Sequence, residues 1–372
     1  ACTSSVAHTS LFLLVTFVTP SVCRRASGTL LSSSSDALLH LTSVFNMSGS
    51  ASVTASAIHM NVGESVSLQD TSSLIVDARG AAAETGEKPG GTSSSGYLGG
   101  GGAGHGGGGG KSSSNHAGGG VYGSALVPVA PGSGGGTGRF NNHAKAGGAG
   151  GGVINMTVGS SLTVSSGATI TANGAAGLAG HTGSGGYYTN IAASGGGGGS
   201  GGSILINVGA VYGSGEIRAN GGRGGERGQN TYTNAWGHHG GGGGGGRIAL
   251  YVTSSLSDQV TLNAFGGSSS ASPGAAGTIF TAVGSNRTLV IDNRPTAALT
   301  SVGTMTVPAS EVGLLGLTLL RIVNSLVVLE CPVDANETDI RSSTVSASDK
   351  LVAISLTTSS TTWTTSASVA VH

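Results

Sequence analysis

Carboxylate side chains are missing from the middle of this chain. No Asp or Glu occurs between Lys88 and Gly215, although the 372 residues include 16 acidic and 16 basic ones. Glycoside hydrolysis needs a pair of carboxylates, and calcium sites need several oxygen ligands close together. The sequence therefore predicts no catalytic, cofactor or metal site, and it indicates that the protein is not an enzyme.

Histidines are the other candidates for chemistry, and most of them lie in glycine-rich segments. These are His105, His116, His143, His181, His238 and His239. Metal-bound imidazoles are usually oriented by a hydrogen bond to a carboxylate or carbonyl, and only glycines follow the His238-His239 pair. We expect these rings to donate hydrogen bonds out of a layer of packed backbone. Weak capture of zinc or copper is the alternative.

Aromatic residues make up only 4% of the chain, so their presence in the glycine-rich segments is informative. Tyr187, Tyr188, Tyr232 and Trp236 are expected at the tips of these segments. Aromatic rings combine a large apolar face with a polar edge, which suits them to stacking on a ligand such as a carbohydrate. The simpler alternative is that they cap the ends of loops.

Four Asn-x-Ser/Thr triplets are candidate acceptors for N-linked glycans. They begin at Asn46, Asn155, Asn286 and Asn336. Asn155 falls between Ile154 and Met156, so it faces outward if those two residues face a core. Together the four triplets favour a secreted or cell-surface location.

Composition excludes several classes of partner. The formal net charge is zero, so neither nucleic acid nor an anionic membrane surface is expected to bind. Three cysteines, Cys2, Cys23 and Cys331, cannot build a disulfide framework, although one bridge from Cys2 or Cys23 to Cys331 is open. No segment suggests insertion into a membrane. The partners expected are a second copy of the chain or a surface polysaccharide.

The elements that position these residues are short strands with period-two alternation. The pattern occurs four times, beginning at Ile58, Ile154, Ile204 and Ile248. The copies end at Gly80, Gly174, Gly221 and Gly266, which are spaced by 94, 47 and 45 residues. The double first interval predicts a worn copy at 122–132. Sequential repeats of short strands predict an all-β fold, a right-handed parallel β-helix (β-solenoid) with a period of about 47.

Glycine-rich excursions interrupt the repeats at 90–152, 175–202 and 222–246, and glycine supplies 71 residues of the chain. Structureless loops of this size are uncommon in a compact domain. Polyglycine forms an extended helix with three residues per turn, and such helices pack side by side because no Cβ separates them. We therefore expect the excursions to pack as polyglycine II helices. The alternative is a β-sandwich array with disordered glycine-rich loops.

Three segments follow from these patterns. Residues 1–25 contain the short apolar run Leu11–Val18 and are expected to be a signal peptide, a buried strand being the alternative. Residues 26–284 hold the glycine-rich repeats. Residues 285–372, rich in Ser, Thr and Val, are expected either to continue the solenoid or to form a second β domain.

The junctions between glycine runs and strands resemble the glycine-rich cell-surface proteins of plants and protists. The resemblance rests on GGAGHGGGG at 101–109, GGGVYGS at 118–124, GGSIL at 201–205, IRANGG at 217–222 and GGGGGGRIALYV at 241–252. It covers about residues 58–283 and implies an extracellular, wall- or surface-associated protein with β-helical character. The expected function is a non-catalytic structural or scaffold protein. The alternatives are an adhesin or carbohydrate-binding surface protein and, less favoured, an ice-binding surface.

Overall fold

The computed structural model describes residues 5–9, 12–17, 29–32, 36–92, 97–140, 143–183, 194–231, 234–293, 303–307, 314, 316–347, 351–363 and 369–371. Strands account for 44% of the chain, and the described residues contain no α-helix. The prediction of an all-β protein is confirmed. Within the same residues, no helix has the length and hydrophobicity needed to cross a membrane.

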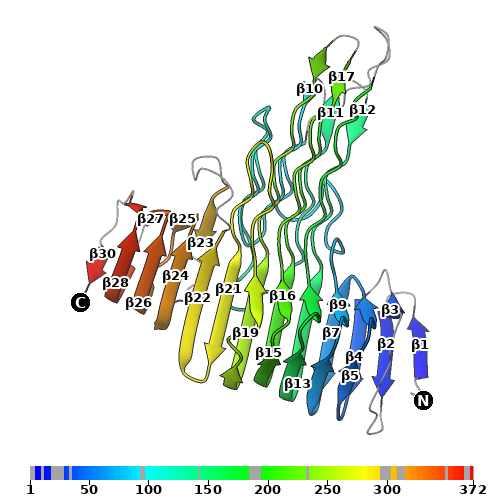
Figure 1. The fold of residues 1–372 in the computed structure, drawn as a ribbon, viewed down its shortest axis with the longest axis vertical. Helices are drawn as coiled ribbons and strands as arrows, with labels where there is room; N and C mark the ends of the chain where they lie inside the picture. The colour runs from blue at the N-terminus through cyan, green and yellow to red at the C-terminus, as the bar shows by residue number, and fades with distance from the viewer. Residues whose placement is uncertain are drawn as a thin grey trace.

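One large sheet runs through the whole molecule, with the N-terminus at one end and the C-terminus at the other (Figure 1). Its fifteen described strands are β1 (Ser5–Thr9), β2 (Phe12–Phe17), β4 (Asp36–Leu41), β5 (Phe45–Met47), β7 (Ala57–Val62), β8 (Ser65–Leu68), β13 (Val153–Val164), β15 (Ser203–Gly213), β19 (Arg247–Leu256), β21 (Thr278–Val283), β22 (Asn286–Asp292), β24 (Leu317–Val323), β26 (Val333–Arg341), β28 (Leu351–Ser359) and β30 (Val369–Val371). The described part of the apolar run at 11–18 is β2.

Two smaller parallel sheets pack against the large one. The six-stranded sheet contains β3 (Thr29–Ser32), β6 (Ser52–Thr54), β9 (Ser73–Ile75), β14 (Thr169–Thr171), β16 (Glu216–Arg218) and β20 (Thr261–Asn263). The four-stranded sheet contains β23 (Met305–Val307), β25 (Leu326–Leu329), β27 (Thr344–Ala347) and β29 (Thr362–Trp363). A first core lies between the large sheet and the six-stranded sheet. A second core lies between the large sheet and the four-stranded sheet.

The repeats align in register across the large sheet, which explains the first core. Ile58, Ile154, Ile204 and Ile248 are neighbours on parallel strands, and none of the four has any exposed surface. Branched aliphatic side chains suit the pleated surface of a strand and pack well against identical neighbours. Because the alternating strands align in register, their isoleucines form a continuous stack inside the molecule.

The covered face of the large sheet changes between β15 and β22. In β21, Ile279 belongs to the first core, while its neighbour Phe280, which points to the opposite face, belongs to the second. Leu205 on β15 and Ala249 on β19 also belong to the second core, so these strands are covered on both faces. Phe280 pairs with Leu289 on the antiparallel strand β22, and the fully buried core residues of β22, β24 and β26 belong to the second core. The two-residue connection between β21 and β22 includes Gly284 at φ +56°, a conformation that suits a tight hairpin.

The predicted right-handed parallel β-helix is wrong. The sheets are mixed, although largely parallel, and none of them closes. β1 pairs with β2 and β21 pairs with β22 in antiparallel fashion, and two separate cores lie on opposite faces of the large sheet. The alternative, a sandwich array with disordered loops, fails as well. The strands of successive repeats pair in parallel, and the described glycine segments are hydrogen-bonded to one another.

The worn repeat expected at 122–132 also does not exist. β13 pairs directly with β7, at Val153↔Ala57, and with β8, at Ser161↔Ser65, and residues 122–132 contribute no strand to the large sheet. Residues 121–131 instead form a connection over the outer face of β15 and β19. Ser203 Oγ donates to the Ala130 carbonyl, and the Tyr251 hydroxyl donates to that of Leu126.

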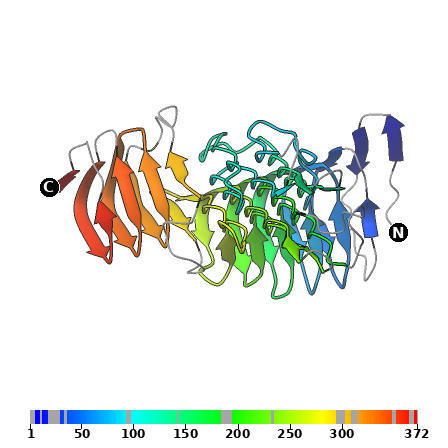
Figure 2. The same cartoon turned by 90° about the horizontal axis from the view of Figure 1, so that it is seen from above.

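The glycine-rich segments project from the sheet as a bundle of extended tracts, which we call the glycine array (Figure 1). Its tracts are residues 80–92, 99–111, 116–121, 131–138, 146–152, 174–180, 195–202, 221–228, 240–246 and 266–277. Figure 2 shows the tracts end-on, side by side in the middle of the molecule. Short strands lie at their outer end: β10 (Tyr97–Leu98), β11 (Gly138–Phe140), β12 (His143–Lys145), β17 (Gln229–Asn230) and β18 (Ala235–Trp236).

Hydrogen bonds within the array repeat every three residues. Along the tract 240–246, Gly240, Gly243 and Gly246 donate to the tract of residues 219–225, Gly241 and Gly244 donate to Gly100 and Ala103, and Gly242 and Gly245 donate to Ser272 and Ala275. A chain with three residues per turn points its amides in three directions in this way. Buried backbone groups that have no water nearby are thereby satisfied by neighbouring tracts.

The tracts of the glycine array lie too close together for side chains to fit between them. A Cβ on Gly197 would lie 1.8 Å from the carbonyl oxygen of Gly101, and one on Gly244 would lie 1.9 Å from that of Gly107. Both partners are backbone atoms that are held by other hydrogen bonds. Glycine is therefore required by the close approach of the tracts, not by an unusual φ.

The corners between strands and array are built from a ladder of side chains. Asn173 accepts a bond from the amide of Asn220 at 2.8 Å, and Asn220 accepts one from the amide of Phe265 at 2.8 Å. Asp77 accepts from the Asn173 amide at the start of the ladder. The Ala-Asn-Gly sequence suggests a left-handed corner, but these asparagines do not have positive φ. They align successive repeats instead.

Candidate functional site

The outer end of the glycine array carries the most distinctive exposed side chain of the described residues, Trp236 on β18. Its exposed fraction is 49%, and β18 pairs with β17 through Gln229↔Trp236. The hairpin lies at the far end of the tracts, away from the large sheet (Figure 1). Tyr187, Tyr188 and Tyr232, the other predicted stacking residues, lie outside the described residues.

Arg227 completes a small platform with Trp236. Its guanidinium carbon lies 4.4 Å from the centre of the indole ring, a distance typical of a cation–π contact. The Gln229 amide group donates to the Asn234 side-chain oxygen at 2.6 Å and ties the base of the hairpin together. Because Asn234 has φ +57°, it supplies the tight turn that leads into β18.

A charged cluster lies next to this platform on the same tract. Glu226 forms an ion pair with Arg223, lies 2.8 Å from His239 Nδ1 through its Oε2, and accepts a bond from Ser270 Oγ at 3.0 Å. Partial burial raises the pKa of Glu226, but the bonds from Ser270 and Arg223 and the nearby positive charges outweigh it and lower the pKa overall. The carboxylate is therefore ionised at neutral pH.

Histidines from distant segments meet beside Glu226. Ser113 Oγ lies 3.3 Å from His238 Nδ1 and accepts a bond from the His239 amide at 2.9 Å. The pKa of His238 is lowered by burial first, and then by the charges of Arg227, His239 and His116. Among the described residues, no group of three or more His, Cys, Asp or Glu side chains is arranged to hold a metal ion.

No protein family, curated protein or solved structure matches this chain. Its function is therefore inferred from the geometry of its own residues. At the outer end, that geometry offers an exposed indole, a guanidinium against it and several hydrogen-bonding side chains. Such a surface can bind a polar ligand with a flat apolar face, and it contains no pair of carboxylates suited to glycosidic bond cleavage in the part described.

A second cluster of polar side chains is buried where the array meets the large sheet. Arg247, the residue after the seven consecutive glycines, has no exposed surface and is the largest fully buried side chain of those described. Its Nε donates to the Tyr122 carbonyl at 2.9 Å, and Nη1 donates to Thr278 Oγ1 at 3.1 Å. Burying a guanidinium is costly, and these two hydrogen bonds offset part of that cost.

His105 packs against this arginine and stays neutral. Its ring centre lies 4.6 Å from that of Tyr122, and Nδ1 donates to the Gly201 carbonyl at 2.8 Å. Burial, and then the charge of Arg247, lower the pKa of His105 to about 3. Burial also raises the pKa of Tyr122 to about 12. Since all three side chains are buried, the cluster anchors the array to the sheet and is closed to ligands from solvent.

The four glycosylation candidates occupy different environments. Asn286 and Asn336 are exposed on β22 and β26, whereas Asn46 and Asn155 are half-buried within β5 and β13. Asn155 does lie between two fully buried residues, Ile154 and Met156. The exposed pair is the more accessible to a modifying enzyme. Cys331 is buried in the second core, and Cys2 and Cys23 lie outside the described residues.

Several residues of these clusters were not singled out from the sequence. Arg227, Glu226 and Arg223 occur in a run of glycines as ordinary surface charges, and Arg247 reads as the start of a strand. One signal was available: a charged residue enclosed by glycine on one side and β-branched residues on the other has no local partner. Only the return of distant tracts supplies its contacts.

Proposed function

We propose that the protein is a non-catalytic, extracellular structural protein in which the glycine array holds a surface away from the sheets. The observation that carries this proposal is the hydrogen bonding between tracts, which repeats every three residues and crosses the array in several directions. Cross-linked backbone of this kind resists bending, because moving one tract breaks bonds to several neighbours. Stacked strands in the sheets extend the same rigidity along the molecule.

The location and the non-catalytic role are each supported by one feature. Asn286 and Asn336 are exposed within Asn-x-Thr triplets, as an acceptor for a glycan must be, which favours an extracellular location. The absence of carboxylates from residues 89–215 supports a role without catalysis, because those residues offer no pair of carboxylates for acid–base chemistry.

The location and the structural role can be tested on cells that produce the protein. An antibody raised against the folded chain should label intact cells as strongly as permeabilised ones, and the protein should remain with the wall or surface fraction after detergent extraction. Endoglycosidase treatment should reduce its mass, and Asn286→Gln with Asn336→Gln should remove most of that change. Labelling that appears only after permeabilisation would show that the proposal is wrong.

A second candidate function is adhesion through carbohydrate binding at the outer end of the array. The observation that favours it is the half-exposed Trp236 with Arg227 against its ring, on a strand that pairs with β17 at the outer end of the array. Aromatic stacking and a nearby guanidinium would together bind the apolar face and the hydroxyls of a sugar.

Glycan-array binding with a matched pair of variants tests this second function. Trp236→Ala should lower the binding signal by at least tenfold. Tyr212→Ala, which removes an aromatic side chain of similar exposure (51%) from β15, should leave the signal unchanged. Equal loss in both variants, or binding by neither variant nor the parent protein, would remove carbohydrate adhesion from consideration.

A further inference from the structure

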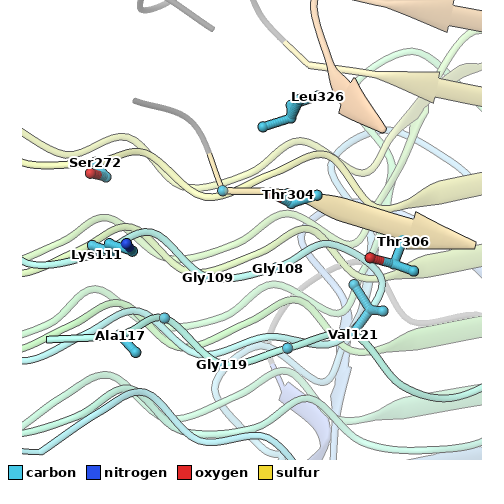
Figure 3. Close-up of a pocket in the computed structure, with 13 residues that line it drawn as sticks. Gly108, Gly109, Lys111, Ala117, Gly119, Val121, Ser272, Thr304, Thr306 and Leu326 are labelled. Carbon is cyan, nitrogen blue, oxygen red and sulfur yellow. The ribbon is translucent and has the colours of Figure 1, made fainter. Parts of the chain in front are cut away.

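A groove of about 440 Å³ runs along the side of the glycine array where it meets the four-stranded sheet (Figure 3). Gly108 and Gly109 form its floor. One wall is the tract of residues 117–121, and the other is Gly303, Thr304 and Thr306, with Leu326 above them. Most of its lining is backbone, since seven of these positions are glycine or alanine.

The two walls are both hydrogen-bonded to the floor. Gly109 donates its amide to the carbonyl of Gly119, and Gly108 donates to that of Thr304, at 2.8 and 3.0 Å. On its remaining sides the floor tract is bonded to Gly102, to residues 242–245 and to residues 272–275. In the part of the chain that the structure describes, the side between the two walls is the one without a hydrogen-bonded tract. The groove therefore corresponds to a lattice position of the array that none of the described tracts fills.

Backbone groups along one wall remain available for a further tract. Within the described residues, the amides of Gly118 and Gly120 have no hydrogen-bond acceptor, whereas Gly119 between them donates to Gly102. Gly120 is exposed and Gly118 is half-buried. Amides two residues apart on such a chain point in different directions, so a tract lying in the groove would accept from one of the two, and the amide of the exposed Gly120 is the one that we assign to it.

We propose that the groove binds an extended, glycine-rich peptide of a partner protein, with three residues per turn. At the spacing used in this array, positions that face a neighbouring tract have no room for a Cβ: one on Gly109 would lie 2.0 Å from the Gly102 carbonyl oxygen. Two of every three residues of the occupant would face the floor and the wall, and the third would face Thr304, Leu326 or solvent. The groove thus selects the sequence pattern Gly-Gly-X.

Fluorescence anisotropy with two labelled peptides tests the proposal on the full chain. The probe is (Gly-Gly-Ser)4 and the control is (Ala-Ala-Ser)4, which differs only by the methyl groups. The glycine peptide should bind at least tenfold more tightly. Gly120→Pro removes one donor and should weaken binding about fivefold, the effect of one hydrogen bond. Gly120→Ala is the matched control, because its Cβ would meet only the Lys88 side chain, at 3.9 Å, and should bind normally.

A variant that fills the groove guards against misfolding at residue 120. Thr304→Trp leaves the backbone bond from Gly108 in place and should abolish binding of the glycine peptide. Equal affinity for the two peptides, no affinity for either, or unchanged binding in both Gly120→Pro and Thr304→Trp would overturn the proposal. Sedimentation velocity decides the remaining case: a dimer of the parent protein that Thr304→Trp converts to monomer would assign the groove to a second copy instead.

Discussion

The first core and the glycine array are both buried, yet they are built on opposite rules. In the core, large branched side chains such as Ile154 and Ile204 fill the space between sheets and remove apolar surface from water. In the array, most residues are glycine, and buried backbone groups bond to each other. One region is stabilised mainly by the hydrophobic effect and the other by hydrogen bonds and close contact of main chains.

This difference teaches how the two regions tolerate change. Ordering glycine costs more backbone entropy than ordering any other residue, so the array depends on every tract having its neighbours. The core gains from each side chain separately. Alanine is therefore a useful probe, since it removes atoms from one region and adds an atom to the other.

The largest effect is expected in the core. Ile204→Ala should lower the free energy of unfolding by about 2–5 kcal/mol, because it leaves a cavity at a site with no exposed surface. Ile204→Val should cost only about 0.5–1.5 kcal/mol. Chemical denaturation followed by circular dichroism measures both. A similar cost for the two variants would mean that the isoleucine stack is not tightly packed.

Hydrogen exchange compares the array with its own edge. The amides of Gly241 to Gly245 are bonded to neighbouring tracts and should exchange at least about a hundredfold more slowly than an unstructured chain, which corresponds to about 3 kcal/mol of local opening. The amides of Gly118 and Gly120 should exchange much faster. Random-coil rates at Gly241 to Gly245 would contradict the packed array.

Adding a methyl group to the array should lower the stability of the protein at one position and raise it at another. Gly243→Ala places a Cβ 2.1 Å from the Gly199 carbonyl oxygen and should destabilise the protein by about 1–3 kcal/mol. Gly120→Ala meets open space and should raise stability by about 0.4–1 kcal/mol, since alanine restricts the unfolded chain. Equal effects at the two positions would show that tract packing does not limit side-chain size.

Acidification should weaken the junction between the two regions. The pKa of His105 is about 3 in the folded protein and near 6.5 when unfolded, so the unfolded state binds the proton first as the pH falls. The stability contributed by neutral His105 is complete above pH 6.5 and is lost towards pH 3, by about 1.4 kcal/mol per pH unit at most.

The measurement compares unfolding midpoints of the parent and His105→Asn between pH 7 and pH 4. Asparagine keeps a donor for the Gly201 carbonyl but does not titrate, so the variant should lose less stability than the parent on acidification. Parallel pH profiles would show that protonation of His105 does not contribute.

Much of the local structure was predictable from the sequence. Alternation at Ile58, Ile154, Ile204 and Ile248 predicted strands with one buried face, and each of these residues is fully buried. The arrangement of the strands from β21 onward was harder to predict. Ile279 and Phe280 point to opposite faces, as neighbours on a strand do, and both are buried because the first core covers one face of β21 and the second core covers the other. Alternation alone does not tell which face is covered, and the β-helix prediction failed at this point.

The candidate sites were also predicted only in part from the sequence. Trp236 was expected at the tip of a glycine segment and lies there, half-exposed. Its partner Arg227, the buried contact of Arg247 with Tyr122 and the groove beside Gly118 were not foreseen. The Arg247–Tyr122 contact joins residues 125 apart in the chain. Glycine tracts are nearly identical in sequence, so nothing local specifies which of them become neighbours.

The sequence by itself determined the all-β character, the positions of the repeating strands and the segments where only backbone can pack. These follow from side-chain size and period, which are local properties. The tertiary structure alone decided which face of each strand is covered, which tracts bond to one another and which lattice position has no tract among the described residues. Those outcomes depend on long-range pairing of near-identical segments, where the free energy differs through the whole set of neighbours and not through any single residue.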